Sequence, residues 1–451
     1  MSVMLQAERK ARSSHARRLI AVLFPLYLYA YLDRNLINVF LPDIQADFGL
    51  GDSELGLLAG TAFALGLSLA IIPVGLLADR WSKRGVMVGG IILWSAMTFL
   101  CGFSWDYQSF FVFRTGVGVG EAVLVPIAYA AISESVDALE RPRVLSLVWT
   151  GSVFGLALAM GVGGLFDEAA PVGGVLRGEW MGSWRSAFKL VGAIGFFFAV
   201  LPLLLPAVGR VRPSGERAVS VFSFFIGIRS FAGPYLAAVV PLSMLNVGLL
   251  SWLPTFYVRT FGHETASIGP LLAGISLVAG LAGALLVGSA ISRLSIARGR
   301  DLTIDALLVG GLVMLPITAL TLSPLLGDYS LVGAGVIYAY LSGVYVLTGA
   351  AAMAAIPPAI RSQVLAVYSF LIAVTGMTLG SFVFGAVSDL AGLAPDQFWI
   401  PAMATAVSLL IVSSLAMAMC RRPYQVLQDD KYSFQIKRLV TQGERKENSH
   451  A

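Results

Sequence analysis

The sequence predicts an all-α, polytopic membrane protein whose twelve transmembrane helices form two bundles of six. Hydrophobic residues make up 57% of the 451 residues and charged residues only 13%, whereas soluble domains carry roughly 25% charged residues. Uncharged apolar runs recur along the chain, and a run of about 20 residues is long enough to span a bilayer. A soluble fold so poor in charge would not cover its own surface, so the surrounding solvent must itself be apolar.

The apolar runs define twelve predicted spans in chain order. They lie at 18–42, 53–79, 84–103, 107–134, 142–166, 185–206, 230–258, 266–291, 302–323, 329–356, 362–390 and 396–420. Hydrocarbon offers backbone N–H and C=O groups no partner, so each span should be an α-helix. No small-residue cleavage site ends the first run, and we therefore interpret it as a retained span rather than a signal peptide.

Basic residues gather in alternate loops, and this pattern predicts the orientation of the helices. Lys and Arg precede the first span, follow the last and occupy most of the loops after even-numbered spans, while the other loops lean acidic. Loops rich in Lys and Arg stay in the cytoplasm, so both termini of this multi-pass cell-membrane protein should be cytoplasmic. We predict an N-terminal tail over 1–17, one bundle over 18–207, a cytoplasmic linker over 208–229, a second bundle over 230–420 and a C-terminal tail over 421–451.

Short motifs recur at equivalent places in the two halves of the chain. The pairs are Gly75-x-x-x-Asp79-Arg80 with Gly288-x-x-x-Ser292-Arg293, and Arg141-x-x-Val144-Leu145 with Arg361-x-x-Val364-Leu365. Parallel repeats of six spans are a transporter architecture. The repeats therefore predict two related bundles that rock against each other.

Four charged residues lie inside predicted spans. Asp33 and Arg34 are in the first, and Arg114 and Glu121 are in the fourth. Each charge at a helix centre costs about 2.5–3.5 kcal/mol, and four unpaired charges would cost roughly 10 kcal/mol, comparable to the stability of a domain. Arg114 and Glu121 share a face but are separated by about 10 Å, which is long for a direct pair. We therefore predict that the four residues pair across the first and fourth spans.

These charges also suggest a function. Burial favours the neutral form of a carboxyl group and a nearby arginine favours the charged form, so Asp33 and Glu121 are candidate proton carriers. Arg34 and Arg114 would bind an anionic head group when the carboxylates are protonated. The alternative is a static salt bridge that only stabilises the bundle, but ionisable residues inside a membrane usually serve function.

Uncharged polar residues also follow helical spacing within spans. The candidates are Asn38, Ser243, Asn246, Tyr338, Ser342, Tyr345 and Thr348. Such residues either line a substrate cavity or form hydrogen bonds between packed helices. Trp252 and Tyr257, near the end of the seventh span, are expected to be anchors at the membrane surface.

The loop Gly75-Leu-Leu-Ala-Asp79-Arg80-Trp-Ser-Lys83-Arg84 resembles the signature loop of the major facilitator superfamily. Its predicted role is a cytoplasmic latch that holds the outward-open state. Asp79 would face the positive N-terminus of the eleventh helix near Arg361, and Arg80 would pair with Glu134 or Asp137. An ordinary basic loop would explain Lys83 and Arg84 equally well, but it would not explain Asp79.

Within that superfamily the first half of the chain, about residues 25–165, resembles the Spinster family. The resemblance rests on Tyr31-Leu-Asp33-Arg34-Asn35, Leu41-Pro42-x-Ile44 and Arg114-x-x-Val117-Gly-x-Gly120-Glu121-Ala122. It implies a proton-coupled or facilitated carrier of lysophospholipids or sphingosine phosphate, with Asp33, Arg34 and Glu121 at the family's charged positions. The run Ala-Val-Leu-Val-Pro126 after Glu121 departs from the hydroxyl-bearing residues expected of eukaryotic members.

Three alternatives to a lipid carrier arise. Anion:cation symporters, which carry sugar acids, are similar in their Asp-Arg and Arg/Glu pattern, but spans poor in Asn, Gln and Lys favour an amphipathic substrate. A non-transporting sensor would use the same cavity. A membrane enzyme needs a nucleophile, base or metal; no histidine lies in a predicted span, so we expect no catalysis, metal or cofactor.

The expected partners follow from this interpretation. They are a small amphipathic or anionic substrate, protons and the lipid bilayer, and we expect the protein to be a monomer. The net charge is +5, but the basic residues form no continuous face, so a nucleic-acid partner is not expected.

The latch gives a first testable prediction. Asp79→Asn should shift the protein toward the state open to the cytoplasm by roughly two- to fivefold, because about 0.5–1 kcal/mol of charge–dipole stabilisation is lost. Faster thiol labelling of cysteines placed at cytoplasmic helix ends would report the shift. Lys83→Gln, a charge change in the same loop, serves as the control, and unchanged labelling of Asp79→Asn would refute the latch.

Overall fold

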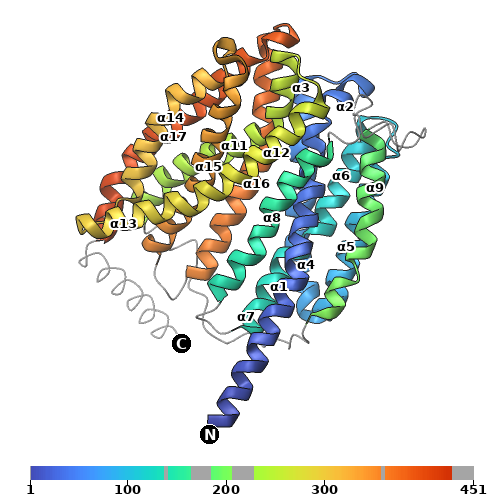
Figure 1. Ribbon diagram of the computed structural model, residues 1–451, viewed down its shortest axis with the longest axis vertical. Coiled ribbons are helices and arrows are strands. Elements are labelled where there is room, and N and C mark those ends of the chain that lie inside the picture. Colours follow the sequence, from blue (N-terminus) through green and yellow to red (C-terminus); the bar gives the residue numbers. More distant parts are fainter. Residues whose placement is uncertain (1, 137–140, 164–183, 206–227, 357–360, 429–451) are drawn as a thin grey trace, which may run out of the picture.

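In the computed structural model, the described residues are 2–136, 141–163, 184–205, 228–356 and 361–428; they form helices joined by turns and include no strand (Figure 1). Eleven helical stretches among them are long and apolar enough to cross a membrane. A twelfth, shorter apolar stretch, Leu147–Gly161, lies where the fifth span is predicted. The predicted all-α, multi-pass fold is confirmed, and the expected twelve spans are consistent with these stretches.

The first half of the chain forms one bundle. Its helices are α1 (Ser2–Val39), α2 (Leu41–Phe48), α3 (Asp52–Gly56), η1 (Leu57–Thr61), α4 (Ala62–Arg80), α5 (Lys83–Cys101), α6 (Tyr107–Glu121), α7 (Leu124–Ser135), α8 (Arg141–Gly163), α9 (Trp184–Phe198) and η3 (Leu201–Leu204). Helix α1 packs on α8, α4 packs on α6, and α5 packs on both α6 and α9. The second span is the continuous run of α3, η1 and α4.

The second half forms the other bundle. Its helices are α11 (Arg229–Phe261), α12 (Thr265–Ala282), η4 (Gly283–Val287), α13 (Gly288–Arg298), α14 (Thr303–Thr321), η5 (Pro324–Tyr329), α15 (Ser330–Ala355), α16 (Arg361–Ala391), η6 (Pro395–Gln397) and α17 (Trp399–Gln428). Helix α11 packs on α16 and α17, and α15 packs on α12 and α14. Most of the linker predicted at 208–229 and of the C-terminal tail lies outside the described residues, so those boundaries stay predictions.

The two bundles touch along several helix pairs. Helix α8 packs on α12, α1 touches α11, and α16 packs on α3 and η1 of the first half. Figure 1 shows α2 and α3 at the end of the molecule opposite to the N-terminus. We call this end the distal end, and the orientation predicted from the basic loops would place it outside the cytoplasm.

The fourth predicted span is interrupted beside its acidic residue. Helix α6 ends at Glu121 and α7 begins at Leu124. Pro126 has no N–H, so it cannot continue the helical hydrogen bonding back to Ala122. Glu121 is 14 residues after Tyr107, which places it about 21 Å along a span of 26 residues, near the middle.

The start of α6 is fixed by a cap. The Asp106 carboxylate accepts a hydrogen bond of 2.8 Å from the backbone N–H of Ser109, and hydrogen bonds from Ser109 lower the pKa of Asp106 below its usual range. Such N-caps stabilise the first turn of a helix, because they satisfy a backbone N–H group that has no partner within the helix. The helix that carries Arg114 and Glu121 therefore has a defined beginning.

The expectation for Trp252 and Tyr257 is wrong. Both side chains are buried, with 1% and 0% exposure, instead of lying at a membrane surface. The indole N–H of Trp252 donates to the carbonyl of Ser381 at 2.9 Å, and the Ser330 hydroxyl donates to the Tyr257 oxygen at 3.2 Å. These aromatic residues tie α11 to α16 and α15, because a neighbouring helix offers them the polar partner that an interface would otherwise supply.

Candidate functional site

An ion pair joins the first and fourth spans inside the membrane. The guanidinium of Arg34 on α1 donates to the carboxylate of Glu121 at the break between α6 and α7. The Arg34 side chain is 16% exposed and the Glu121 side chain only 3%. The ion pair offsets the free-energy cost of placing either charge alone in hydrocarbon. Arginine is the more exposed of the two side chains.

Two aromatic rings flank the same arginine. The Cζ atom of Arg34 lies 4.7 Å from the ring centroid of Tyr31 and 4.7 Å from that of Phe63. Contacts of this kind stabilise a desolvated cation by about 1–2 kcal/mol. Phe63, on α4, is buried with 1% exposure. Sequence reasoning missed Phe63, because one aromatic residue in an apolar run gives no signal.

Asp33 and Arg114 occupy a second, fully buried position, each with 0% exposure. Asp33 accepts a 2.5 Å hydrogen bond from the Thr98 hydroxyl on α5, and Arg114 donates to the backbone oxygen of Arg34 at 3.1 Å. The predicted ion pair between Asp33 and an arginine is not among those of the described residues. Neighbouring residues on a helix point about 100° apart, so Asp33 faces α5 while Arg34 faces Glu121.

Both buried charges keep open hydrogen-bonding positions. Asp33 Oδ1, Arg114 Nε and Arg114 Nη1 have no hydrogen-bond partner within the part of the chain that the structure describes. Burying an ion without full pairing is costly, and such a group tends to neutralise instead. The site therefore contains one well-paired carboxylate, Glu121, and one sparsely paired carboxylate, Asp33.

The structure places the seven uncharged polar candidates in different surroundings. Ser243 and Thr348 are buried and donate to carbonyl groups of their own helices, those of Val240 and Val344. Tyr345 is 48% exposed. The remaining candidates are Asn38, which donates to Asn35 at 3.2 Å, Ser342, which is half-buried on α15, and Asn246 and Tyr338, which line a pocket.

That pocket lies between α11 and α15. It has a volume of about 270 Å³ that includes space open to solvent, and leucine and isoleucine side chains dominate its lining together with Ala334, Asn246 and Tyr338. The hydroxyl of Tyr338, a residue 8% exposed, has no hydrogen-bond partner among the described residues. The pocket is thus apolar with one buried hydroxyl group in its wall.

The predicted cytoplasmic latch stays a prediction. Asp137 and the side chains of Gly75, Asp79, Arg80, Glu134 and Arg361 lie outside what the structure describes. Lys83 begins α5, whose first turn is capped by the Ser82 hydroxyl. Arg84 donates to the carbonyl of Leu205, a contact that stays within the first bundle.

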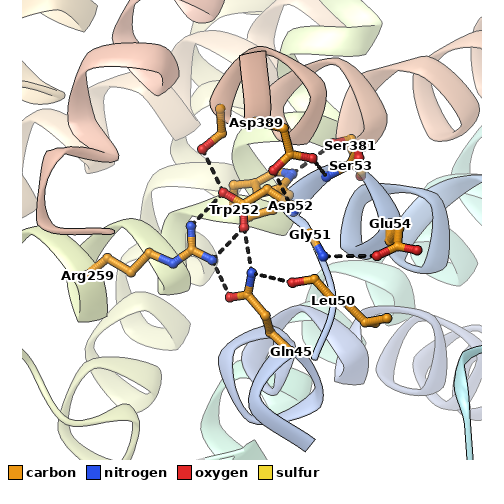
Figure 2. Close-up of polar contacts among 11 residues, drawn as sticks. Gln45, Leu50, Gly51, Asp52, Ser53, Glu54, Trp252, Arg259, Ser381 and Asp389 are labelled. Carbon is orange, nitrogen blue, oxygen red and sulfur yellow. Dashed lines mark hydrogen bonds and ion pairs between the residues drawn. The ribbon is translucent and has the colours of Figure 1, made fainter. Parts of the chain in front are cut away.

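A polar network joins the two bundles at the distal end, and Figure 2 shows its contacts. The guanidinium of Arg259, on α11, makes two hydrogen bonds of 2.7 and 2.8 Å to the carboxylate of Asp52, on α3. The Gln45 side chain donates to Asp52 at 2.9 Å and accepts from Arg259 at 2.5 Å. Such two-pronged arginine–carboxylate pairs are among the strong hydrogen bonds in proteins.

A second carboxylate, this time from the second bundle, accepts hydrogen bonds from the first bundle. Asp389, near the end of α16, accepts hydrogen bonds from the backbone N–H groups of Asp52 and Ser53 at 2.9 and 2.8 Å (Figure 2). The Ser388 hydroxyl donates to Asp52 at 2.6 Å. One bundle therefore supplies the N-terminal cap for a helix of the other, where the helix dipole favours negative charge.

Below this network the two backbones touch. A Cβ atom added at Gly60 would lie 1.8 Å from the carbonyl oxygen of Met377, and one at Gly56 would lie 2.5 Å from that of Ser381. The Thr61 hydroxyl donates to the carbonyl of Thr378 at 2.9 Å. We call this contact the distal interface. It consists of the residues from Asp52 to Thr61 in the first bundle and of α16 and Arg259 in the second, and in this structure the two sides touch.

Comparison with known proteins gives a family and several relatives. Residues 23–380 match the model of the Major Facilitator Superfamily. An MFS-type efflux pump of Mycolicibacterium smegmatis is 27% identical over 404 residues, which cover 86% of this chain and 88% of that protein. Protein spinster homolog 1 of Bos taurus is 28% identical over 260 residues, 55% of this chain and 47% of the relative, so the match spans about half of that relative.

Two further similarities bear on function and fold. A probable L-galactonate transporter of Escherichia coli is 28% identical over 193 residues, 42% of this chain and 40% of that protein. The crystal structure of a bacterial homolog to the human lysosomal transporter Spinster, in an inward-facing and unoccupied conformation, superposes with a TM-score of 0.76 at 22% identity. It covers 92% of this chain and 98% of that one, and this likeness concerns the fold.

The distal interface gives a second prediction. Arg259→Gln should increase the population with separated bundles at this end by roughly 5–150-fold, because one to three kcal/mol of charged hydrogen bonding is lost. Pulsed electron paramagnetic resonance between spin labels at Gln108→Cys and Asp396→Cys, two exposed positions at the distal ends of the bundles, would measure the separation.

A matched control is available for this experiment. Arg185→Gln breaks the ion pair of Arg185 with Asp47, which lies within the first bundle, and it should leave the distance distribution unchanged. If Arg259→Gln gave the same distances as the parent protein, the network would not be what holds this end closed.

Proposed function

On the premise that the chain belongs to the major facilitator superfamily, whose model matches residues 23–380, we propose that it is a secondary active transporter that works by alternating access and couples its substrate to protons. The observation that carries the proposal is the Arg34–Glu121 ion pair at mid-span, with Asp33 and Arg114 buried behind it. Charges in such a position serve binding or proton transfer more often than stability.

The ion pair offers a simple exchange between substrate and proton. Arg34 is the more exposed partner, and its guanidinium matches a carboxylate or phosphate with two parallel hydrogen bonds. An anionic substrate group that pairs with Arg34 in place of Glu121 leaves the Glu121 carboxylate without its cation. A carboxylate so isolated in an apolar site takes up a proton rather than remain charged. Substrate binding and protonation of Glu121 would therefore accompany each other.

Movement between the two sides follows from the interface and the broken helix. The bundle over 1–207 would rock against that over 229–420, alternately opening and closing the distal interface. Near the middle of the fourth span, Pro126 removes one backbone hydrogen bond beside Glu121, while Ala122 and Val123 keep helical φ and ψ angles. This gap in the hydrogen bonding supports a single central site that both sides reach in turn.

We propose an amphipathic, lipid-like substrate of the lysophospholipid or sphingosine-phosphate type. The pair of cations Arg34 and Arg114 would suit a phosphate head group. The facing leucine and isoleucine side chains of α11 and α15 would offer a hydrocarbon tail an apolar surface where these helices part. Similarity to spinster homologs over about half of their length supports this class.

A proton-coupled symporter for organic anions or sugar acids is the second candidate. Similarity to a probable L-galactonate transporter supports it. So does the hydrogen bond that Asn38, one turn beyond Arg34, donates to Asn35, the residue directly after Arg34, since amide groups recognise hydroxyl groups. A sensor without transport is the remaining alternative, and a counterflow assay would separate it because a sensor binds without exchange.

The proton role of Glu121 gives the third prediction. Glu121→Gln should abolish the pH dependence of transport while leaving counterflow exchange measurable, because the amide mimics the protonated side chain and does not titrate. Uptake into proteoliposomes over a range of pH values would test it. Glu264→Gln, an exposed acidic residue outside the distal interface, is the control. A Glu121→Gln variant that kept the pH profile of the parent protein would exclude the proposed role.

The substrate class gives the fourth prediction. Lysophosphatidate should raise the unfolding temperature of the purified protein, since a ligand at a hundred times its Kd adds about 2.7 kcal/mol of stability. A monoacylglycerol of equal chain length, which lacks the phosphate, should have a much smaller effect, and Arg34→Gln should remove the difference between them. Stabilisation by galactonate and not by lysophosphatidate would overturn the lipid class in favour of the sugar-acid alternative.

A further inference from the structure

The second span changes its helix type beside the distal interface. The backbone N–H of Ala62 bonds to the carbonyl of Leu57, five residues earlier, so Leu57–Thr61 is a π-helical turn between α3 and α4. Such turns are rare and occur mostly as single insertions at functional sites, because each holds one residue more than an α-helical turn. The turn therefore holds one residue more than a turn of the α-helix on either side of it.

Contacts with the other bundle hold the turn itself. Gly60 lies against the carbonyl oxygen of Met377 with no room for a Cβ atom, and Thr61 donates to the carbonyl of Thr378. Both partners belong to α16. The π turn, like α3 before it, would consequently lose its contacts with α16 when the distal interface separates.

Contacts within the first bundle hold the residues that follow. A Cβ atom at Gly118 would lie 2.1 Å from the carbonyl oxygen of Phe63, and one at Gly66 would lie 1.9 Å from that of Thr115. Helix α4 is thus seated backbone to backbone on α6, the helix of Arg114 and Glu121. The junction between a segment held by α16 and a segment held by α6 falls at the π turn.

The ring of Phe63 connects this junction to the charged site. Phe63 lies two residues after Thr61. Its ring centroid is 4.7 Å from the Cζ atom of Arg34 and 5.8 Å from that of Arg114. Arg34 Nε and Arg114 Nε have no hydrogen-bond partner among the side chains that the structure describes. The aromatic face is therefore a direct neighbour of both guanidinium groups.

We propose that the π turn Leu57–Thr61 couples the distal interface to the Arg34–Glu121 ion pair, with Phe63 as the positioning residue through which it acts. This inference rests on the proposed alternating access. Separation from α16 lets the turn rewind toward α-helix, a register change of one residue or about 100°. Because the backbone of Phe63 stays seated on Gly118 of α6, the change is taken up just ahead of Phe63, and only its ring shifts relative to Arg34. By reciprocity, weakening the ion pair favours separation of the interface.

The test is a double-mutant cycle read at the distal end. Glu121→Gln weakens the ion pair, and in the otherwise unchanged protein it should raise the population with separated labels at Gln108→Cys and Asp396→Cys by about fivefold, the size expected of one cation–π contact. In Phe63→Leu, which keeps apolar bulk and removes the ring, Glu121→Gln should produce no such change. Phe63→Tyr should restore the response.

The controls make each outcome decisive. Phe188→Leu removes another fully buried ring of the same bundle, which contacts Trp184 and Phe110 and lies over no arginine of the described residues. This variant should leave the response intact. Should Phe63→Leu fail to fold, Phe63→Met replaces it. An equal response with and without the ring, or no response in the parent protein, would overturn the coupling. Distances are measured without substrate, so this result is independent of whether counterflow detects transport.

Discussion

The ion pair between Arg34 and Glu121 is the interaction on which the rest of the site depends. Hydrocarbon does not solvate a charge, so each ionised side chain requires a partner within the bundle. The pair fixes how α1 meets the break between α6 and α7. The aromatic rings of Tyr31 and Phe63 lie over this arginine, whose Nε atom has no hydrogen-bond partner among the described residues.

The second span connects this site to the contact between the bundles. The backbone N–H groups of its first residues, Asp52 and Ser53, are capped by Asp389, and the Asp52 carboxylate pairs with Arg259 of the other half. Its π turn lies against α16, and its next turn carries Phe63 to the arginines. A single helix therefore touches both the closed end and the charged centre, which is the arrangement that alternating access requires if the state of one is to influence the other.

Hydropathy predicts the spans well, because the length of an apolar run reports the thickness of hydrocarbon directly. The charges inside spans one and four are equally visible in the sequence. The sequence does not show which partner each charge takes. Asp33 accepts its hydrogen bond from Thr98, and residue spacing along one helix does not determine which residue of a neighbouring helix it meets. The distal interface was not predictable either, because Asp52 and Arg259 are 207 residues apart and, like Asp389, look in the sequence like ordinary polar residues near helix ends. The π turn has no sequence signal, because a glycine or threonine in a span is common.

The central claim is that an anionic substrate takes Arg34 from Glu121 and that Glu121 is then protonated. Proton uptake by the purified protein in weakly buffered solution, recorded with a pH indicator as lysophosphatidate is added, tests it most directly. The account predicts uptake of about one proton per protein on saturation, absent in Glu121→Gln although the ligand still binds. Saturable binding to the unaltered protein with no proton taken up would contradict it.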